Sequence, residues 1–123
     1  MEARFFPTNE SSEFYTEERC YIIEIMNKEG IDFSIARARV EPGVTTALHA
    51  VKKTTEAYYI LQGNGLVQSA NGFEQTVNSG DVMVFPPGIE QKITNRGNDD
   101  LIFLAICAPR FVPESYIHFE VSK

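Results

Sequence analysis

Apolar and polar residues alternate in short runs along this chain, and helical periodicity is hard to find. The runs are rich in Val, Ile, Phe, Tyr and Thr, which favour β-strands. The pattern predicts strands at Arg19–Asn27, Phe33–Val40, Thr46–Val51, Ala57–Gln62, Gly65–Ala70, Phe73–Val77, Val82–Phe85, Gln91–Asn95 and Leu101–Ala108. Many short strands at near-regular spacing are typical of a closed barrel or a two-sheet jelly roll.

The segments between these runs contain turn-forming residues, such as NKEG, EPG, GNG, NSGD, PPG and NRGNDD. Asn71-Gly72 stands between two alternating runs and predicts a tight hairpin. The run LIFLAIC is apolar throughout, so the outer face of its sheet needs cover from a second subunit or from the N-terminal arm (Glu2–Glu18). We expect the arm to dock through its aromatic residues, and the tail PRFVPESYIHFEVSK to run extended over the surface.

The composition is that of one ordinary globular domain. The chain has 123 residues, of which 43% are apolar and 23% charged, and it contains no repeat or linker, so we predict a single domain over residues 1–123. The net charge is −6 without a basic stripe, so no nucleic-acid partner is expected. The apolar runs are too short to span a membrane, and the first ten residues lack a secretory pattern. We expect a cytoplasmic protein.

Four residues outside any motif have two possible roles each. Cys20 and Cys107 lie in apolar runs without CxxC spacing, which favours buried free thiols over a disulfide, and Cys107 could also line a pocket. Arg37 and Arg39 share one face of a strand. They either clamp an anionic substrate or, in the interpretation we favour, face solvent or a subunit interface.

Two stretches combine glycine turns with polar residues at fixed spacing. The first is GVTTALHAVKKTTEAYYILQG (residues 43–63), and the second is GDVMVFPPGIEQKITN (residues 80–95). Residues two apart on a strand share a face, so Val51 must face the same way as His49. By the same rule, Glu56 and Tyr58 point in a common direction.

Together the two stretches resemble the paired motifs of the cupin superfamily, a small jelly-roll β-barrel. The glycine, proline and asparagine framework matches at each expected position, and PPGIEQKITN and LIFLAICAPRF are similar to segments of small single-domain bacterial cupins of unassigned function. The resemblance implies an all-β fold, a double-stranded β-helix (jelly roll) with an N-terminal arm and a C-terminal tail. The apolar strands and the resemblance also suggest a homodimer.

In cupins, the first motif supplies two histidines and a glutamate to a metal, and the second motif supplies a third histidine. This chain keeps His49 and Glu56 but has Val51 and Gln91 at the two other ligand positions. The only other histidine, His118, lies in the tail outside both motifs. A three-histidine site is therefore impossible within one subunit.

Three potential ligands remain for a divalent transition metal such as Mn²⁺, Fe²⁺, Co²⁺, Ni²⁺ or Zn²⁺. They are an imidazole nitrogen of His49, the carboxylate of Glu56 and the amide oxygen of Gln91. Tyr58 shares the strand face of Glu56 and is the candidate catalytic residue. The strand pattern leaves open whether this set binds a metal or forms a metal-free polar pocket.

Three functions follow from this site. The first is a metal-dependent enzyme acting on a small polar molecule, of the dioxygenase, decarboxylase, isomerase or cyclase type, among which the fold does not choose. The second is a non-catalytic module that binds a small ligand without metal. The third, a metal-free epimerase, needs an aspartate paired with His49, and only the fold could bring one close.

Overall fold

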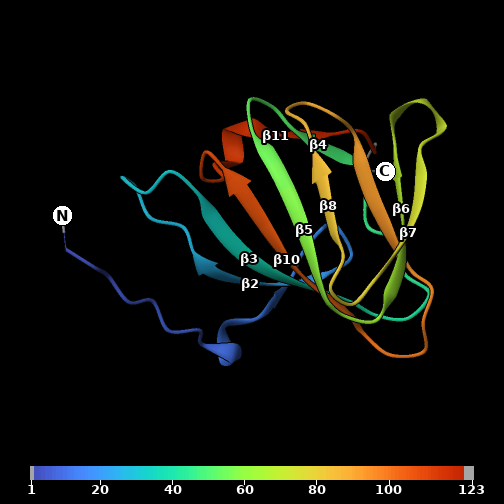
Figure 1. The fold of residues 1–123 in the computed structure, drawn as a ribbon, viewed down its shortest axis with the longest axis horizontal. Helices are drawn as coiled ribbons and strands as arrows, with labels where there is room; N and C mark the ends of the chain where they lie inside the picture. Colours follow the sequence, from blue (N-terminus) through green and yellow to red (C-terminus); the bar gives the residue numbers. More distant parts are fainter. Residues whose placement is uncertain (1, 121–123) are drawn as a thin grey trace.

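The computed structural model describes residues 2–120 as a barrel of two antiparallel sheets (Figure 1). The larger sheet has the order β1 (Phe14–Tyr15), β2 (Tyr21–Met26), β3 (Ser34–Val40), β10 (Leu101–Ala108), β5 (Thr55–Gln62) and β8 (Val82–Phe85). The smaller sheet has the order β11 (Tyr116–His118), β4 (His49–Val51), β9 (Gln91–Asn95), β6 (Asn64–Ser69) and β7 (Glu74–Asn78). Outside the sheets, the described residues form three 3₁₀ turns: η1 (Glu10–Ser12), η2 (Ala70–Gly72) and η3 (Pro113–Ser115). The predicted all-β jelly roll is confirmed.

Every predicted strand is present, and β8, β9 and β10 have the predicted bounds. β4 begins later than predicted because the segment before it joins β9 only through an isolated bridge, Thr45 to Thr94. Two strands were not predicted, β1 and β11, since each is too short to show an alternating pattern. Within residues 2–120, no helix is long and apolar enough to cross a membrane.

The N-terminal arm projects from the barrel and is attached through the pairing of β1 with β2 and through two of its carboxylates (Figure 1). Glu10 lies 2.8 Å from Arg37, and Glu13 lies 2.7 Å from Arg39. The expectation that aromatic residues dock the arm is met only in part: Tyr15 packs on Tyr21 with ring centroids 5.0 Å apart, whereas Phe5 is 86% exposed. The two arginines therefore bind the arm on the outside of the sheet and do not form a clamp inside the barrel.

Turns in both motifs place the strands that form the site. Gly63 has a φ of +89°, and a Cβ at this position would lie 3.2 Å from the carbonyl oxygen of Asp100, so only glycine fits without strain. After β8, the predicted Pro-Pro-Gly bend brings the N–H of Gly88 to the carbonyl of Val51, at 3.0 Å. This bond holds the start of β9 against β4, where His49 and Gln91 are register partners.

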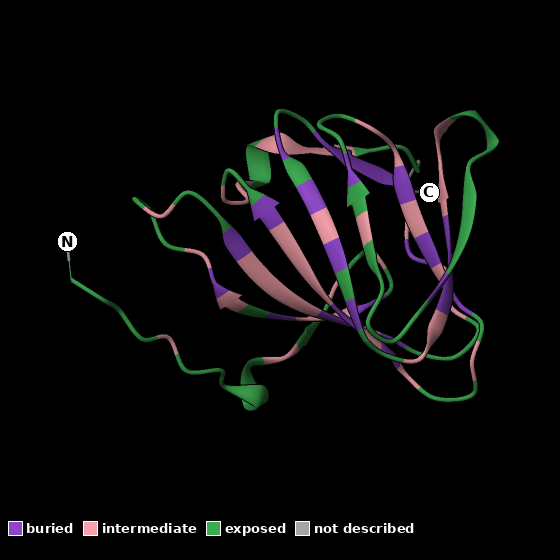
Figure 2. Ribbon diagram, viewed as in Figure 1, coloured by how far each residue is buried: buried purple, intermediate pink, exposed green. Residues whose placement is uncertain are grey.

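The hydrophobic core fills the end of the barrel where β3 ends and β10 begins. Side chains that are fully shielded from solvent meet there from both sheets, namely Val40, Ile60, Val67, Ile93 and Leu101. Buried and more exposed residues alternate along the strands, as expected for a sheet with one face inside the barrel (Figure 2). The opposite end of the barrel interior is less completely filled.

Candidate functional site

A cavity of about 460 Å³ lies between the two sheets, at the end of the barrel opposite the hydrophobic core. Its walls come from β2, β3, β4, β5 and β10, from the turn that precedes β2, and from the C-terminal tail. The tail contributes Phe111, Pro113, Tyr116 and His118, and its strand β11 pairs with β4, with His118 as the register partner of His49. The described part of the tail therefore closes one side of the barrel instead of running over the surface; its last three residues lie outside the described chain.

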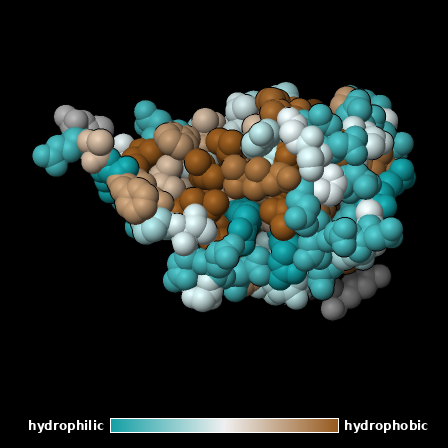
Figure 3. All heavy atoms as spheres, turned by 60° about the horizontal axis from the view of Figure 1, so that its bottom comes forward, coloured by the Kyte–Doolittle hydropathy of each residue, from teal (hydrophilic) through white to brown (hydrophobic). Residues whose placement is uncertain are grey.

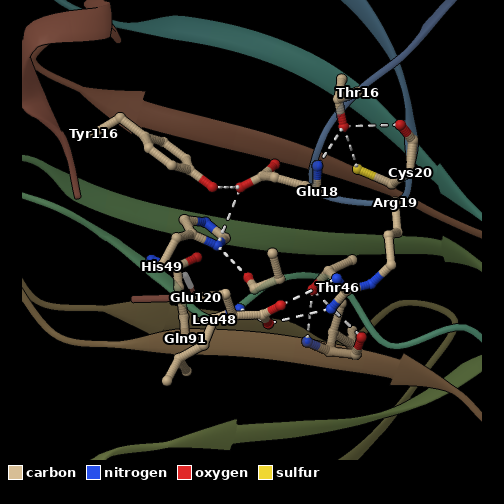
Figure 4. A network of polar contacts seen from close by, with 12 residues as sticks. Thr16, Glu18, Arg19, Cys20, Thr46, Leu48, His49, Gln91, Tyr116 and Glu120 are labelled. Atoms are coloured by element: carbon tan, nitrogen blue, oxygen red, sulfur yellow. Dashed lines mark hydrogen bonds and ion pairs between the residues drawn. The ribbon is translucent and has the colours of Figure 1, made fainter. Parts of the chain in front are cut away.

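His49, on β4, is held in one orientation (Figure 4). Its Nδ1 lies 2.9 Å from the carbonyl oxygen of Ala47 and 3.1 Å from Oε2 of Glu18. Both neighbours are acceptors, so Nδ1 carries the proton and Nε2 keeps its lone pair in the neutral imidazole. The ring also stacks on Tyr116, with centroids 5.1 Å apart. An oriented imidazole with a free Nε2 suits a metal ligand or a general base.

Glu18 is a candidate that neither motif indicated. It lies in the turn before β2, next to Arg19, which has a φ of +68°. Its Oε2 accepts the hydroxyl of Tyr116 at 2.5 Å and also faces Nδ1 of His49. Burial, aided by the Glu18 carboxylate, raises the pKa of Tyr116, so this hydroxyl stays protonated as a donor. The acidic partner sought for His49 is thus a glutamate, brought close by the fold.

Glu56, on β5, presents a buried oxygen without a partner. The residue is 7% exposed, and its Oε1 has no hydrogen bond within residues 2–120. Burial raises the pKa of Glu56 to about 7, although the nearby His49 acts in the opposite direction. A buried carboxyl with a free oxygen favours a site for a cation or for a ligand that donates a hydrogen bond.

Gln91 and Tyr58 form a buried pair at the cavity wall. Gln91 is 1% exposed, and its amide oxygen accepts the Tyr58 hydroxyl at 2.5 Å. Tyr58 packs against Phe85 and Phe103, and burial raises its pKa well above the ordinary value, so its hydroxyl is a donor. Tyr58 lines the cavity, whereas Gln91 is not one of the lining residues of the described chain. Because Gln91 does not line the cavity, a metal bound there can use its amide oxygen only after this side chain reorients.

Apolar and thiol side chains complete the wall beside these groups. Val51 is 4% exposed and lines the cavity with His49, as strand parity predicted. Cys20 and Cys107 are free, buried thiols that also line it, which confirms that interpretation. Burial raises the pKa of Cys20 to about 12 and that of Cys107 further, so both remain neutral. In the described part of the chain, no three His, Cys, Asp or Glu side chains are grouped to hold a metal.

The cavity wall carries acidic side chains without basic Lys or Arg side chains from the described residues. Four carboxyl groups line it, from Glu17, Glu18, Glu24 and Glu56, and no Lys or Arg of the described residues does so. In a partly enclosed site, such an arrangement gives a negative potential that attracts cations and repels anions.

Residues 36–107 match the family model described as "Cupin domain". The chain belongs to the cupin family. This cupin is 39% identical over 71 residues to an oxalate-binding protein of Thermotoga maritima, an alignment that spans 58% of each chain. It is 35% identical over 105 residues, or 82% of each chain, to an uncharacterized protein of Methanocaldococcus jannaschii.

The fold of this cupin is also found in solved structures. An uncharacterized protein with a double-stranded β-helix domain from Klebsiella pneumoniae superposes with a TM-score of 0.77 at 18% identity. The match covers 98% of this chain and 100% of that one. At this identity the likeness shows the jelly-roll fold alone.

Proposed function

We propose that this cupin binds a divalent transition metal at His49 and Glu56 and uses it to hold a small polar molecule. The supporting observation is that, among the described residues, neither Nε2 of His49 nor Oε1 of Glu56 has a hydrogen-bond partner, and that both residues line the same acidic cavity. These two donors suit Mn²⁺, Fe²⁺, Co²⁺, Ni²⁺ or Zn²⁺, with Gln91 as a third ligand once its amide has rotated. Water and the bound molecule would complete the shell.

The oxalate-binding relative suggests that the small molecule carries a chelating carboxylate or a similar oxygen pair. A free oxalate dianion would meet four carboxyl groups in this cavity without a Lys or Arg among the described wall residues. A cation at His49 and Glu56 removes this repulsion, so we expect metal to bind before the organic ligand.

A bound metal would supply Lewis acidity to a carbonyl or enolate oxygen. The residues of this chain have supporting roles: Glu18 orients His49, and Tyr58, the candidate catalytic residue, offers a neutral hydroxyl. The apolar walls, including Val51, limit access of water to the bound molecule. A metal in this role is compatible with dioxygenase, decarboxylase, isomerase and cyclase reactions, and the fold does not choose among them.

Cobalt(II) titration of chelator-treated protein tests the metal site. We expect one visible absorption band that saturates with one equivalent of cobalt, and its loss in His49→Ala and Glu56→Gln. The control is Glu24→Gln, which removes a cavity carboxyl outside the donor pair. Oxalate should raise Tm only in the presence of cobalt. A wild-type protein that binds no cobalt at neutral pH contradicts the proposal.

The Glu18–His49 pair favours a second candidate, a metal-free site for proton transfer or for ligand binding alone. Glu18 would stabilise a protonated His49 after it acts as a base, and Glu56, with a pKa of about 7, would act as the acid. A thermal-shift screen in EDTA separates the candidates: small organic molecules raise Tm here without metal, and His49→Ala abolishes the shift.

We also propose a homodimer formed through the outer face of the larger sheet. Apolar side chains lie side by side across three strands there, with Leu104 paired to Tyr59 and Tyr59 to Val82. Tyr59 is 40% and Val82 59% exposed. Figure 3 shows hydrophobic residues gathered across the middle of one face, beside the N-terminal arm. Light scattering should give a dimer that Tyr59→Lys converts to monomer; a wild-type monomer at micromolar concentration contradicts this.

A further inference from the structure

The inner face of the larger sheet carries small side chains next to the polar site. Ala36 on β3 and Ala105 on β10 are register partners, and Ala105 is in turn the partner of Tyr58 on β5. Ala38 lies two residues further along β3, on the same face. All three alanines line the cavity, and we call them the alanine floor. Because these side chains end at Cβ, they leave room above the sheet, and Phe103, the register partner of Ala38, bounds this room on the side of the core.

The alanine floor and the polar groups belong to one cavity. Glu56, which is 7% exposed and has a free Oε1, lies two residues before Tyr58 on the same strand face. Val51 adds a second apolar wall at the position where the cupin motif has a histidine. A volume of about 460 Å³ falls in the range of pockets that hold drug-sized ligands, and oxalate is far smaller.

We propose that this cupin takes an amphipathic ligand, with a chelating head at His49 and Glu56 and an aromatic or branched apolar body on the alanine floor. The position of the head rests on the proposed function, and the position of the body rests on the floor itself. The body carries no anionic group, because the cavity wall already holds four carboxyl groups without a Lys or Arg in the described chain.

Two hydroxamic acids test this proposal, because they share a neutral chelating head and differ only in the body. Calorimetry with cobalt-loaded and with EDTA-treated protein should show benzohydroxamic acid binding at least about tenfold more tightly than acetohydroxamic acid, since burial of the phenyl ring adds apolar contact.

Ala105→Leu and Ala36→Leu fill the alanine floor and should abolish this preference, while the affinity for acetohydroxamic acid stays within about twofold. The matched control, Ala70→Leu, lies in η2 between β6 and β7, away from the cavity, and should keep the full preference. Thermal unfolding without ligand shows that each variant is folded; we expect an unchanged or raised Tm, because a cavity is being filled. The two floor variants change different strands, so loss of the preference in either variant, if it is folded, supports the proposal.

The outcomes separate this inference from the proposed function. Equal affinities for the two acids in a wild-type protein that binds cobalt overturn the amphipathic ligand and leave the metal site standing. A preference for benzohydroxamic acid in protein that binds no cobalt supports the apolar floor and contradicts the metal site. A preference that survives in both floor variants places the apolar body elsewhere and overturns the proposal.

Discussion

The two cupin motifs contribute to the cavity in different ways. Within residues 2–120, His49 and Glu56 of the first motif each keep one polar atom without a hydrogen-bond partner, whereas the amide oxygen of Gln91 in the second motif accepts the Tyr58 hydroxyl at 2.5 Å. All three residues occupy family ligand positions. The comparison shows that a motif position determines which wall a side chain belongs to, but that a hydrogen-bond partner on another strand decides whether its donor atom is available.

The largest expected effect concerns the free oxygen of Glu56. In metal-free protein, the folded-state pKa of about 7 lies above the ordinary value of 4.5, so the folded state binds more protons between these values. The contribution of Glu56 to the free energy of unfolding is therefore fully present below about pH 4.5. It is lost as the pH rises through about 7, and the free energy of unfolding falls by about 3 kcal/mol.

Urea unfolding in EDTA from pH 5 to 8.5 measures this fall. Glu56→Gln should remove the dependence, and Glu24→Gln, at an exposed position on β2, should keep it. Saturating cobalt should also remove it, because the metal favours the ionised carboxylate. If the free energy of unfolding of the wild-type protein in EDTA does not change with pH, then ionisation of Glu56 does not destabilise the folded state, which contradicts this prediction.

The second effect tests whether His49 and Glu56 of the first motif can bind a metal without a ligand from the second motif. Val51→His adds an imidazole on the same strand face as His49, so we expect cobalt affinity to rise by roughly a hundredfold. Val84→His, on the exposed side of β8, adds the same group outside the cavity and should change nothing. Unchanged affinity in Val51→His would mean that His49 and Glu56 do not form the centre of a metal site.

These comparisons also show how far the sequence predicts the site. Alternation with a period of two is enough to place His49 with Val51 and Glu56 with Tyr58, because successive side chains on a strand point to opposite faces. The bond from Tyr58 to Gln91 joins residues 33 positions apart, on strands of different sheets. No pattern within one strand reveals such a pairing.

Glu18 escaped prediction for a similar reason. Its contact with His49 depends on the turn at Arg19 and on closure of the barrel by β11, a strand of three residues. The arm was predicted only in part: Tyr15 packs on Tyr21 as expected, but the ion pair of Glu13 with Arg39, which also binds Asp100, joins residues far apart in the sequence. Local periodicity thus gave the strands and their faces, and contacts between distant segments decided the chemistry of the cavity.

The third effect concerns the hydrogen-bonded pair of Tyr58 and Gln91. Tyr58→Phe leaves the buried oxygen of Gln91 without its donor and should lower the free energy of unfolding by about 2 kcal/mol. The same change releases this oxygen, so cobalt should bind more tightly. Tyr59→Phe, on the outward side of the same strand, is the matched control. Lower stability without any gain in cobalt affinity would show that Gln91 is a structural residue and not a metal ligand.

The smallest effect concerns the orientation of His49. Glu18→Gln replaces the charged acceptor at Nδ1 by a neutral amide, and we expect cobalt affinity to fall by about tenfold, as for other partners of metal-bound histidines. Nitrogen-15 NMR of the imidazole in metal-free protein supplies a readout that a purely structural role would not move. The wild-type spectrum should show the Nδ1–H tautomer, and Glu18→Gln should shift toward a mixture of both tautomers. Glu17→Gln, on the adjacent residue of the cavity wall, should leave both measurements unchanged. If the two variants behave alike, the carboxylate of Glu18 contributes only to the general negative potential of the cavity, and the backbone carbonyl of Ala47 alone orients the ring.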